Sequence, residues 1–363
     1  MVQTRRTGEI LDVLAEMAKR FLQVAARPAR RMSMQSIALK DIAGHAPMLG
    51  FGCSAMMGRV GRTASLAALA AAYNAGVIFY DTARSYGYGE SEALLGEFLR
   101  GRRDTVYVST KFGILPAANH PLKRALKPVA RALLQWAPGA RKAVQGQLAA
   151  MSSAGHFSVG ALQQSLDASL RALRTDYVDF LFLHEAPASV LRQDDLFDTL
   201  RQLVVAGKVR RFGIASHPDV IDAAMAAQVP GLQSVQFPCN VFDLRAADRW
   251  LQADSHLVAI ANHPFGGADG IAASKTLLTT LAAAPETPEP LREKLQPMND
   301  ALLADVVLNA ITRDTGVQVA VPSMLRLDHL RANVAAMQHS RFSSDEIRWL
   351  RQAIAVAARS MNA

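Results

Sequence analysis

The chain has 363 residues, of which 50% are hydrophobic and 20% are charged, and its formal net charge is +9. That length fits one large domain or two ordinary ones, and no apolar run is long enough to span a membrane. Two isolated cysteines, Cys53 and Cys239, are too few for a disulfide framework or a zinc site, which favours a reducing, cytoplasmic compartment. The positive charge is concentrated in residues 1–40 and in the acid-free stretch 112–166, which indicates basic appendages rather than a nucleic-acid groove.

We expect residues 1–46 to form a basic N-terminal extension and residues 47–363 to form the main domain. Residues 7–27 place apolar side chains at helical spacing, with acids early and bases late, which predicts an amphipathic helix. No apolar segment follows Arg5 and Arg6, so no signal peptide is expected. The helix either packs on the domain or lies on a membrane surface. Alternatively, the true start is Met32 or Met34, and nothing catalytic is expected in this segment.

From residue 47 onward, short apolar runs alternate with helical patterns. The runs are near-continuously hydrophobic, as strands buried on both faces should be. Eight such runs separated by helices predict a closed parallel α/β barrel, the (β/α)8 or TIM barrel. An open doubly wound sheet is the alternative, but no Gly-x-Gly-x-x-Gly follows the first run. The predicted strands are Leu49–Cys53, Val77–Tyr80, Val106–Ser109, Tyr177–Leu183, Val209–Ala215, Ser234–Phe237, Val258–Ala261 and Val317–Val321.

The helical patterns between these strands include Ala64–Asn74, Val159–Leu173, Asp194–Val205 and Pro218–Ala227. Two connections, 112–157 and 262–297, are too long to be simple turns and are predicted as loop insertions. Because both follow barrel strands, we expect both on the catalytic face. An extra C-terminal helix is predicted over Ser344–Ala358.

Polar residues stand at the ends of three consecutive predicted strands: Asp81, Lys111 and His184. Tyr86 follows Asp81 by five residues in a Gly-rich loop. Singly, each has an ordinary structural explanation, such as capping a turn or facing solvent. An ammonium near a barrel mouth is costly to desolvate without a counter-ion, and Asp81 is on the neighbouring strand. Convergence of all four at one mouth therefore predicts a catalytic site.

These residues suit proton transfer to a carbonyl oxygen. A free Tyr, with a pKa of about 10, is a poor acid near neutrality. Lys111 should stabilise the phenolate and lower the pKa of Tyr86, while Asp81 fixes the ammonium. His184 can donate a hydrogen bond to the substrate oxygen. No side chain supplies a hydride, so a nicotinamide cofactor is implied, and no metal site is expected.

Asp81 with Tyr86, Lys111 after Val-Ser-Thr, and His184 after Asp-Tyr-Val-Asp-Phe-Leu-Phe-Leu resemble the catalytic tetrad of the aldo-keto reductase superfamily. Gly50-Phe51-Gly52 and Gly89-Glu90-Ser91-Glu92 match as well, and the resemblance covers roughly residues 47–340 outside the two insertions. It implies a (β/α)8 barrel that binds NADP(H) in an extended form and reduces aldehydes or ketones.

The resemblance also implies cofactor contacts, with departures. Ser216 and Gln236 match residues that hold the nicotinamide carboxamide, and His217 replaces an Asn in that role. Asn262 stands where the family stacks a Tyr on the nicotinamide. Backbone amides in the following segment remain suitable for the pyrophosphate. That segment contains Pro264, Phe265 and Gly266.

At the adenosine end, Ser323 and His329 occupy positions where basic residues often clamp the 2′-phosphate, and Asn333 matches an adenine contact. Arg326 either supplies the phosphate contact or is a solvated surface residue. NADP(H) is therefore expected on family grounds, with NAD(H) as the open alternative.

The leading hypothesis is an NADP(H)-dependent oxidoreductase that reduces an aldehyde or ketone, or oxidises the corresponding alcohol or sugar, with Tyr86 as general acid or base. The alternative is a catalytically weak cofactor-binding scaffold or regulatory barrel, suggested by the altered cofactor residues and the basic appendages. A small-molecule substrate and no nucleic acid are expected as partners. The basic 112–157 insertion favours an anionic substrate if it contacts one, or else is a solvated lid. The sequence does not predict substrate identity, reaction direction or oligomeric state.

Overall fold

The computed structural model describes residues 37–38, 45–46, 49–116, 155–244, 257–313 and 315–361. The helix predicted over 7–27 and the middle of the 112–157 insertion lie outside the described residues. Within the predicted extension, β1 (Ile37–Ala38) pairs antiparallel with β2 (His45–Ala46). Among the described helices, none combines the length and the apolar character needed to cross a membrane.

Eight further strands form one sheet whose hydrogen-bonded order is β10-β9-β8-β7-β6-β5-β4-β3. A parallel bridge between Leu49, which precedes β3, and Ala320 in β10 links the two ends of this order. Eight parallel strands with helices between them therefore make a nearly closed (β/α)8 barrel, which confirms the predicted fold class. The strands are β3 (Gly50–Gly52), β4 (Phe79–Asp81), β5 (Tyr107–Phe112), β6 (Val178–His184), β7 (Val209–Ala215), β8 (Ser234–Pro238), β9 (Val258–Asn262) and β10 (Val317–Val321).

β7 and β10 have the predicted bounds, whereas β5 runs three residues further than predicted. Its last residues pair in parallel with β6, Lys111 opposite Phe182 and Phe112 opposite Leu183. The prediction that Lys111 follows the strand is therefore wrong: Lys111 lies inside β5, because pairing with β6 continues past the apolar run.

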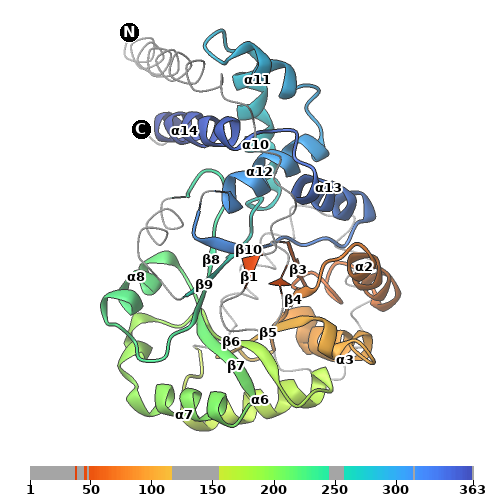
Figure 1. Ribbon diagram of the computed structural model, residues 1–363. Coiled ribbons are helices and arrows are strands. Elements are labelled where there is room, and N and C mark those ends of the chain that lie inside the picture. Colours follow the sequence, from red (N-terminus) through yellow and green to blue (C-terminus); the bar gives the residue numbers. More distant parts are fainter. Residues whose placement is uncertain are drawn as a thin grey trace, which may run out of the picture. The chain divides into compact units, whose positions relative to one another are not determined.

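The described residues divide into two compact units. One comprises Gly52–Ala70 and Tyr80–Val235, and the other contains the remaining described residues. In the first unit, helices lie outside the strands (Figure 1): α3 (Ser91–Phe98), α6 (Val159–Leu173), α7 (Asp194–Val205) and α8 (Pro218–Ala226). The helix α2 (Arg62–Asn74) also begins in this unit. The unit contains three short 3-10 turns, η1 (Tyr86–Gly89), η2 (Arg103–Thr105) and η3 (Ala188–Arg192).

The second unit carries α10 (Gly267–Ala283), α11 (Glu289–Lys294), α12 (Asp300–Thr312), α13 (Leu327–Gln338) and α14 (Ser344–Met361). The segment 262–297, predicted as a long loop, thus contains two helices. One of its glycines and one of its prolines stand at helix starts: Gly266, at φ 64°, is the N-cap of α10, and Pro288 is the N-cap of α11. Leu277, Leu278 and Leu281 bury one side of α10, which is what makes this segment helical.

The two described ends of the 112–157 insertion meet. The amide of His156 donates to the carbonyl of Gly113 at 2.8 Å, and the rings of Phe112 and Phe157 lie edge to face with centroids 5.9 Å apart.

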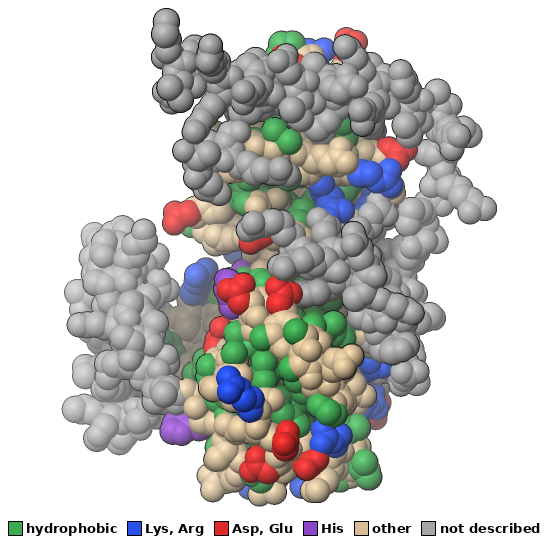
Figure 2. Space-filling view, turned by 90° about the vertical axis from the view of Figure 1, so that its left-hand side faces the viewer, with side chains coloured by type: hydrophobic (Ala, Val, Ile, Leu, Met, Phe, Trp, Pro, Cys, Tyr) green, Lys and Arg blue, Asp and Glu red, His purple; other side chains and the backbone are tan. Residues whose placement is uncertain are grey.

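On the face shown in Figure 2, the described Lys and Arg side chains are interspersed with Asp and Glu and form no continuous basic stripe.

The α3–α6 contact depends on one glycine. A Cβ on Gly96 of α3 would lie 2.3 Å from the carbonyl oxygen of Ala172 in α6, whereas a Cβ on Gly160 would meet nothing within 4 Å. We expect Gly96→Ala to lower the free energy of unfolding by about 1–3 kcal/mol through overpacking. Gly160→Ala, the matched control, should leave it unchanged or slightly raised. Urea unfolding followed by circular dichroism measures both, and a Gly96→Ala protein as stable as the parent would contradict the packing.

Candidate active site

The four predicted catalytic residues come from three adjacent strands of one unit. Asp81 ends β4, Lys111 lies near the end of β5, and His184 ends β6. Tyr86 begins η1, directly after the turn that leaves β4. Because the carboxyl ends of parallel barrel strands open at the same face, this topology brings the four side chains to one mouth.

A buried ion pair occupies the centre of this site. Lys111 Nζ lies 2.6 Å from Asp81 Oδ2, and the side chains are only 1% and 5% exposed. Ser109 Oγ donates to the other carboxylate oxygen of Asp81 at 2.6 Å, and Lys111 Nζ also donates to the carbonyl of Thr82 at 3.0 Å. These additional hydrogen bonds offset the cost of removing both charges from water. Burial alone would lower the pKa of Lys111, but Asp81 and Tyr86 outweigh it and hold that pKa above its ordinary value.

Tyr86 contacts both neighbours with its ring. The Lys111 Nζ lies 4.8 Å from the ring centroid, and the ring meets His184 edge to face at 5.8 Å between centroids. Burial raises the pKa of Tyr86 above its ordinary value, and the Lys111 ammonium lowers it by less. The sequence-based expectation of a net lowered pKa is therefore wrong for this site. It gave weight to the ammonium and omitted desolvation of the phenolate.

The imidazole of His184 is neutral. Burial, assisted by the Lys111 ammonium, lowers the pKa of His184 to about 3. Its Nδ1 is buried and has no hydrogen-bond partner among the described residues. A neutral imidazole offers one N–H donor and one acceptor, so it can donate a hydrogen bond to a neutral carbonyl oxygen.

The loop after β4 separates the two candidate tyrosines. Gly87 adopts φ 59°, and a Cβ there would lie 2.6 Å from the carbonyl oxygen of Met56, so this position requires glycine. Tyr88, also at φ 59°, is 42% exposed, whereas Tyr86 faces Lys111 and His184. The left-handed turn thus directs the first tyrosine inward and the second outward.

Two of the predicted cofactor residues belong to the same unit. Ser216 follows β7, is 4% exposed and donates through Oγ to the carbonyl of Ala186 at 3.2 Å. His217 caps α8, and its side chain is 70% exposed with Nδ1 3.2 Å from Asp219 Oδ2. Ser216 is therefore held in place by the protein, while His217 is turned toward solvent and an acid.

The remaining predicted cofactor residues lie in the other unit. Gln236 is fully buried on β8, and Asn262 ends β9 with its Oδ1 buried and without a partner among the described residues. Pro264 is buried, Phe265 is half-buried and Gly266 is exposed at the start of α10. An orphaned buried carbonyl oxygen and the free amides of a helix N-terminus are the groups that a carboxamide and a pyrophosphate require.

The segment after β10 shows a different pattern. Ser323 is exposed, and Arg326 is paired with Asp328, Nε lying 3.1 Å from Oδ1. Arg326 lowers the pKa of Asp328 to about 2. His329 Nε2 lies 3.8 Å from an Asp300 oxygen. A 2′-phosphate would compete with these acids for Arg326 and His329, so this end fits NADP(H) less well than the other contacts fit a nicotinamide. Asn333 is 3% exposed on α13.

Sequence reasoning missed the residues that support the tetrad. Ser109 lies two positions before Lys111 on β5 and so faces the same side, a signal that strand alternation already contained. Thr110 and Glu92 meet on the opposite side of the strand, Thr110 Oγ1 donating to Glu92 Oε1 at 2.6 Å. Glu92 is part of the Gly-Glu-Ser-Glu match but had no role assigned to it.

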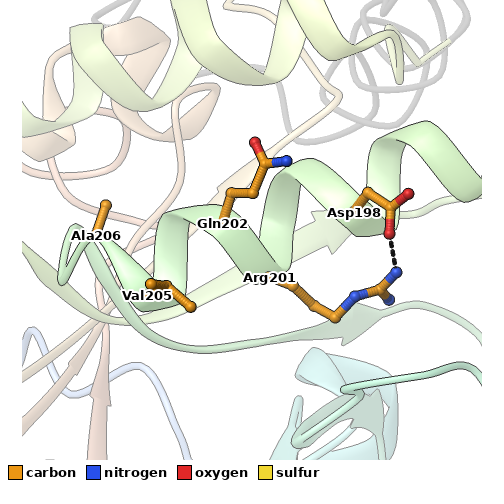
Figure 3. Close-up of a pocket in the computed structure, with 5 residues that line it drawn as sticks. All are labelled: Asp198, Arg201, Gln202, Val205 and Ala206. Atoms are coloured by element: carbon orange, nitrogen blue, oxygen red, sulfur yellow. Dashed lines mark hydrogen bonds and ion pairs between the residues drawn. The ribbon is translucent and has the colours of Figure 1, made fainter.

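One surface hollow, about 370 Å³, lies along α7 and is lined by Asp198, Arg201, Gln202, Val205 and Ala206 (Figure 3). Asp198 pairs with Arg201 there. The last turn of α7 leads to the first residue of β7, at the opposite end of the strands from the tetrad, so this hollow is not the site of the chemistry. Within the described ranges, no group of three or more His, Cys, Asp or Glu side chains could hold a metal ion.

Comparisons with known proteins identify the family. Residues 48–355 match the model of the Aldo/keto reductase family. An aryl-alcohol dehydrogenase of Pestalotiopsis microspora is 32% identical over 171 residues, 44% of this chain and 36% of that protein. Aldo-keto reductase YhdN of Bacillus subtilis is 25% identical over 217 residues, 58% of this chain and 55% of that protein. The chain thus matches between about a third and a half of the length of these curated relatives.

Solved structures share the fold at low sequence identity. An aldo-keto reductase from Bacillus halodurans superposes with a TM-score of 0.60 at 20% identity, over 90% of this chain and 96% of that one. One from Klebsiella pneumoniae, in complex with NADPH, has a TM-score of 0.58 at 21% identity, over 89% and 96%. With the family match covering residues 48–355, the chain belongs to the aldo/keto reductase family.

Proposed function

We propose that this protein is an NADP(H)-dependent oxidoreductase that reduces an aldehyde or ketone, or oxidises the corresponding alcohol, with Tyr86 as the general acid or base. The observation that carries the proposal is the buried Lys111–Asp81 pair, at 2.6 Å, with the Tyr86 ring 4.8 Å from the ammonium. An ion pair this buried is costly, and it stabilises little by itself. Its value lies in placing a fixed positive charge beside a phenol at a strand end.

Each residue has a distinct part in proton transfer. Tyr86 donates its O–H proton to the substrate oxygen, and the resulting phenolate is stabilised by the Lys111 ammonium. Because Asp81 keeps Lys111 charged, that stabilisation is present before the reaction starts. The neutral His184 donates its N–H to the same oxygen and so orients the carbonyl. The raised pKa of Tyr86 keeps the phenol protonated at neutral pH, as reduction requires.

A bound nicotinamide supplies the hydride in this proposal. In the unit that carries the tetrad, Ser216 is the candidate for holding its carboxamide. In the other unit, Gln236 and Asn262 are further candidates, and the orphaned Oδ1 of Asn262 could accept a hydrogen bond. The amides at the start of α10, after Pro264, Phe265 and Gly266, would hold the pyrophosphate. His217, Ser323, Arg326, His329 and Asn333 are the further candidates for cofactor contacts.

NADP(H) is the preferred cofactor because the related enzyme of Klebsiella pneumoniae binds NADPH. The pairing of Arg326 with Asp328 supports NAD(H) as the alternative, since it offsets the charge that a 2′-phosphate would need. The altered cofactor residues, among them the exposed His217, support a second candidate function, a barrel that senses or carries a cofactor with little turnover. Quenching of protein fluorescence by NADPH and by NADH shows which cofactor binds, and turnover of 4-nitrobenzaldehyde distinguishes the reductase from the cofactor sensor. Binding of neither cofactor would contradict both candidate functions.

The role of Tyr86 as general acid is tested by Tyr86→Phe, which keeps the ring against Lys111 and His184 but removes the hydroxyl group and its proton. We expect kcat for 4-nitrobenzaldehyde reduction to fall by about 10²–10⁴-fold, the size of a general-acid contribution. The Kd for NADPH, from fluorescence quenching, should change by less than about twofold, because no cofactor contact is removed. Tyr88→Phe is the control and should remain active. A fully active Tyr86→Phe variant would contradict the proposed mechanism.

The neutral state of His184 has a consequence for stability. Its pKa is about 3 in the folded protein against an ordinary 6.5, so the unfolded chain takes up the proton first as the pH falls. Stability should therefore decrease between about pH 7 and pH 3, and His184 should account for about 2 kcal/mol of the loss by about pH 5. Urea unfolding of His184→Asn should show a correspondingly flatter pH dependence. Replacing the exposed His339 by Asn should leave the slope unchanged, and a parental slope in His184→Asn would refute the assignment.

A further inference from the structure

Glu92, in the first turn of α3, is a buried acid that the proposed mechanism does not use. It is 1% exposed. Its Oε1 accepts a 2.6 Å hydrogen bond from Thr110 Oγ1, and its Oε2 lies 3.4 Å from Nη1 of Arg84. An ionised carboxylate is removed from water only at considerable cost. The burial of this acid therefore needs an explanation.

One contact of Glu92 is made to the strand that carries Lys111. Thr110 and Lys111 are consecutive residues of β5, so their side chains leave opposite faces of the strand. Lys111 points to Asp81 and Tyr86, while Thr110 points to α3. Glu92 therefore fixes α3 to the outer face of β5 at the level of the catalytic ammonium.

The other contact is made to the loop that carries Tyr86. Arg84 lies two residues before Tyr86, and its side chain is 21% exposed. The Nε of Arg84 is buried and lacks a hydrogen-bond partner among the described residues, so the guanidinium depends on Glu92 as its counter-ion. The backbone around Tyr86 is not regular structure, because Gly87 and Tyr88 both adopt left-handed conformations. A second tie between this loop and α3 is the 3.0 Å hydrogen bond between Thr82 Oγ1 and Ser91 Oγ.

We propose that Glu92 is a positioning residue for Tyr86, acting through Arg84. By joining Arg84 on one side to Thr110 on the other, it sets the distance between the loop that carries the phenol and the strand that carries the ammonium. This inference rests on the proposed function of the site. A displacement of about 1 Å in a reacting group can cost roughly 100-fold in rate, so a tie of this kind has a measurable effect on turnover.

The test compares Glu92→Gln with Glu97→Gln, on the same helix. Glu97 pairs with Arg62 on the surface. With 4-nitrobenzaldehyde and NADPH as probes, Glu92→Gln should lower kcat by roughly 10- to 100-fold and change the KM for NADPH by less than about twofold. The solvent deuterium isotope effect on kcat should increase, because proton transfer from a misplaced Tyr86 becomes rate-limiting. Glu97→Gln should match the parent in all three measurements.

Arg84 provides a second route if Glu92→Gln does not fold, as judged by its melting curve. Arg84→Lys keeps the positive charge and should retain most of kcat, whereas Arg84→Met should reproduce the slow, isotope-sensitive phenotype. Folded Glu92→Gln or Arg84→Met proteins with parental kcat and isotope effect would overturn the positioning role. If those variants have parental kcat while Tyr86→Phe is inactive in the same assays, only the role of Glu92 is overturned and the proposed function stands. If Tyr86→Phe is active, the proposed function itself fails.

Discussion

The ion pair between Lys111 and Asp81 is the constraint on which the rest of the site depends. A buried ammonium without a counter-ion would cost about 3–5 kcal/mol, a large share of a folded protein's stability, so the pair favours β4 and β5 ending side by side. The second carboxylate oxygen is then satisfied by Ser109 and the ammonium by the carbonyl of Thr82. With these partners fixed, the turn after β4 has little freedom, and Tyr86 arrives beside the ammonium.

The two faces of β5 make different contacts at the same level of the barrel. The inner face presents Lys111 to Asp81 and Tyr86, and the outer face presents Thr110 to Glu92. Glu92 and Arg84 hold the outside of the loop whose inside carries the phenol. In the proposed mechanism a charge pair on each face of one strand thus controls the position of Tyr86. Only the inner pair touches the reacting groups.

Much of the fold could be predicted because strands buried on both faces leave long apolar runs; β7 and β10 matched to the residue. The tetrad could be predicted because a charge at the end of such a run is costly and needs a partner. The helices α10 and α11 could not be predicted, because glycine and proline are common both in loops and at helix starts, where Gly266 and Pro288 lie. Nor could the sign of the net pKa shift of Tyr86, which depends on how deeply the ring is buried.

In the proposed mechanism, the buried charge pair serves turnover rather than folding. Lys111→Met combined with Asp81→Asn removes both charges and leaves no uncompensated ion in the interior, so the protein should fold. The decisive measurement is kcat of this double variant for NADPH-dependent reduction of 4-nitrobenzaldehyde. We expect a protein that melts near the parent temperature, binds NADPH and turns over at less than about 1% of the parental rate. Parental turnover in that folded double variant would contradict a catalytic role for the charge pair.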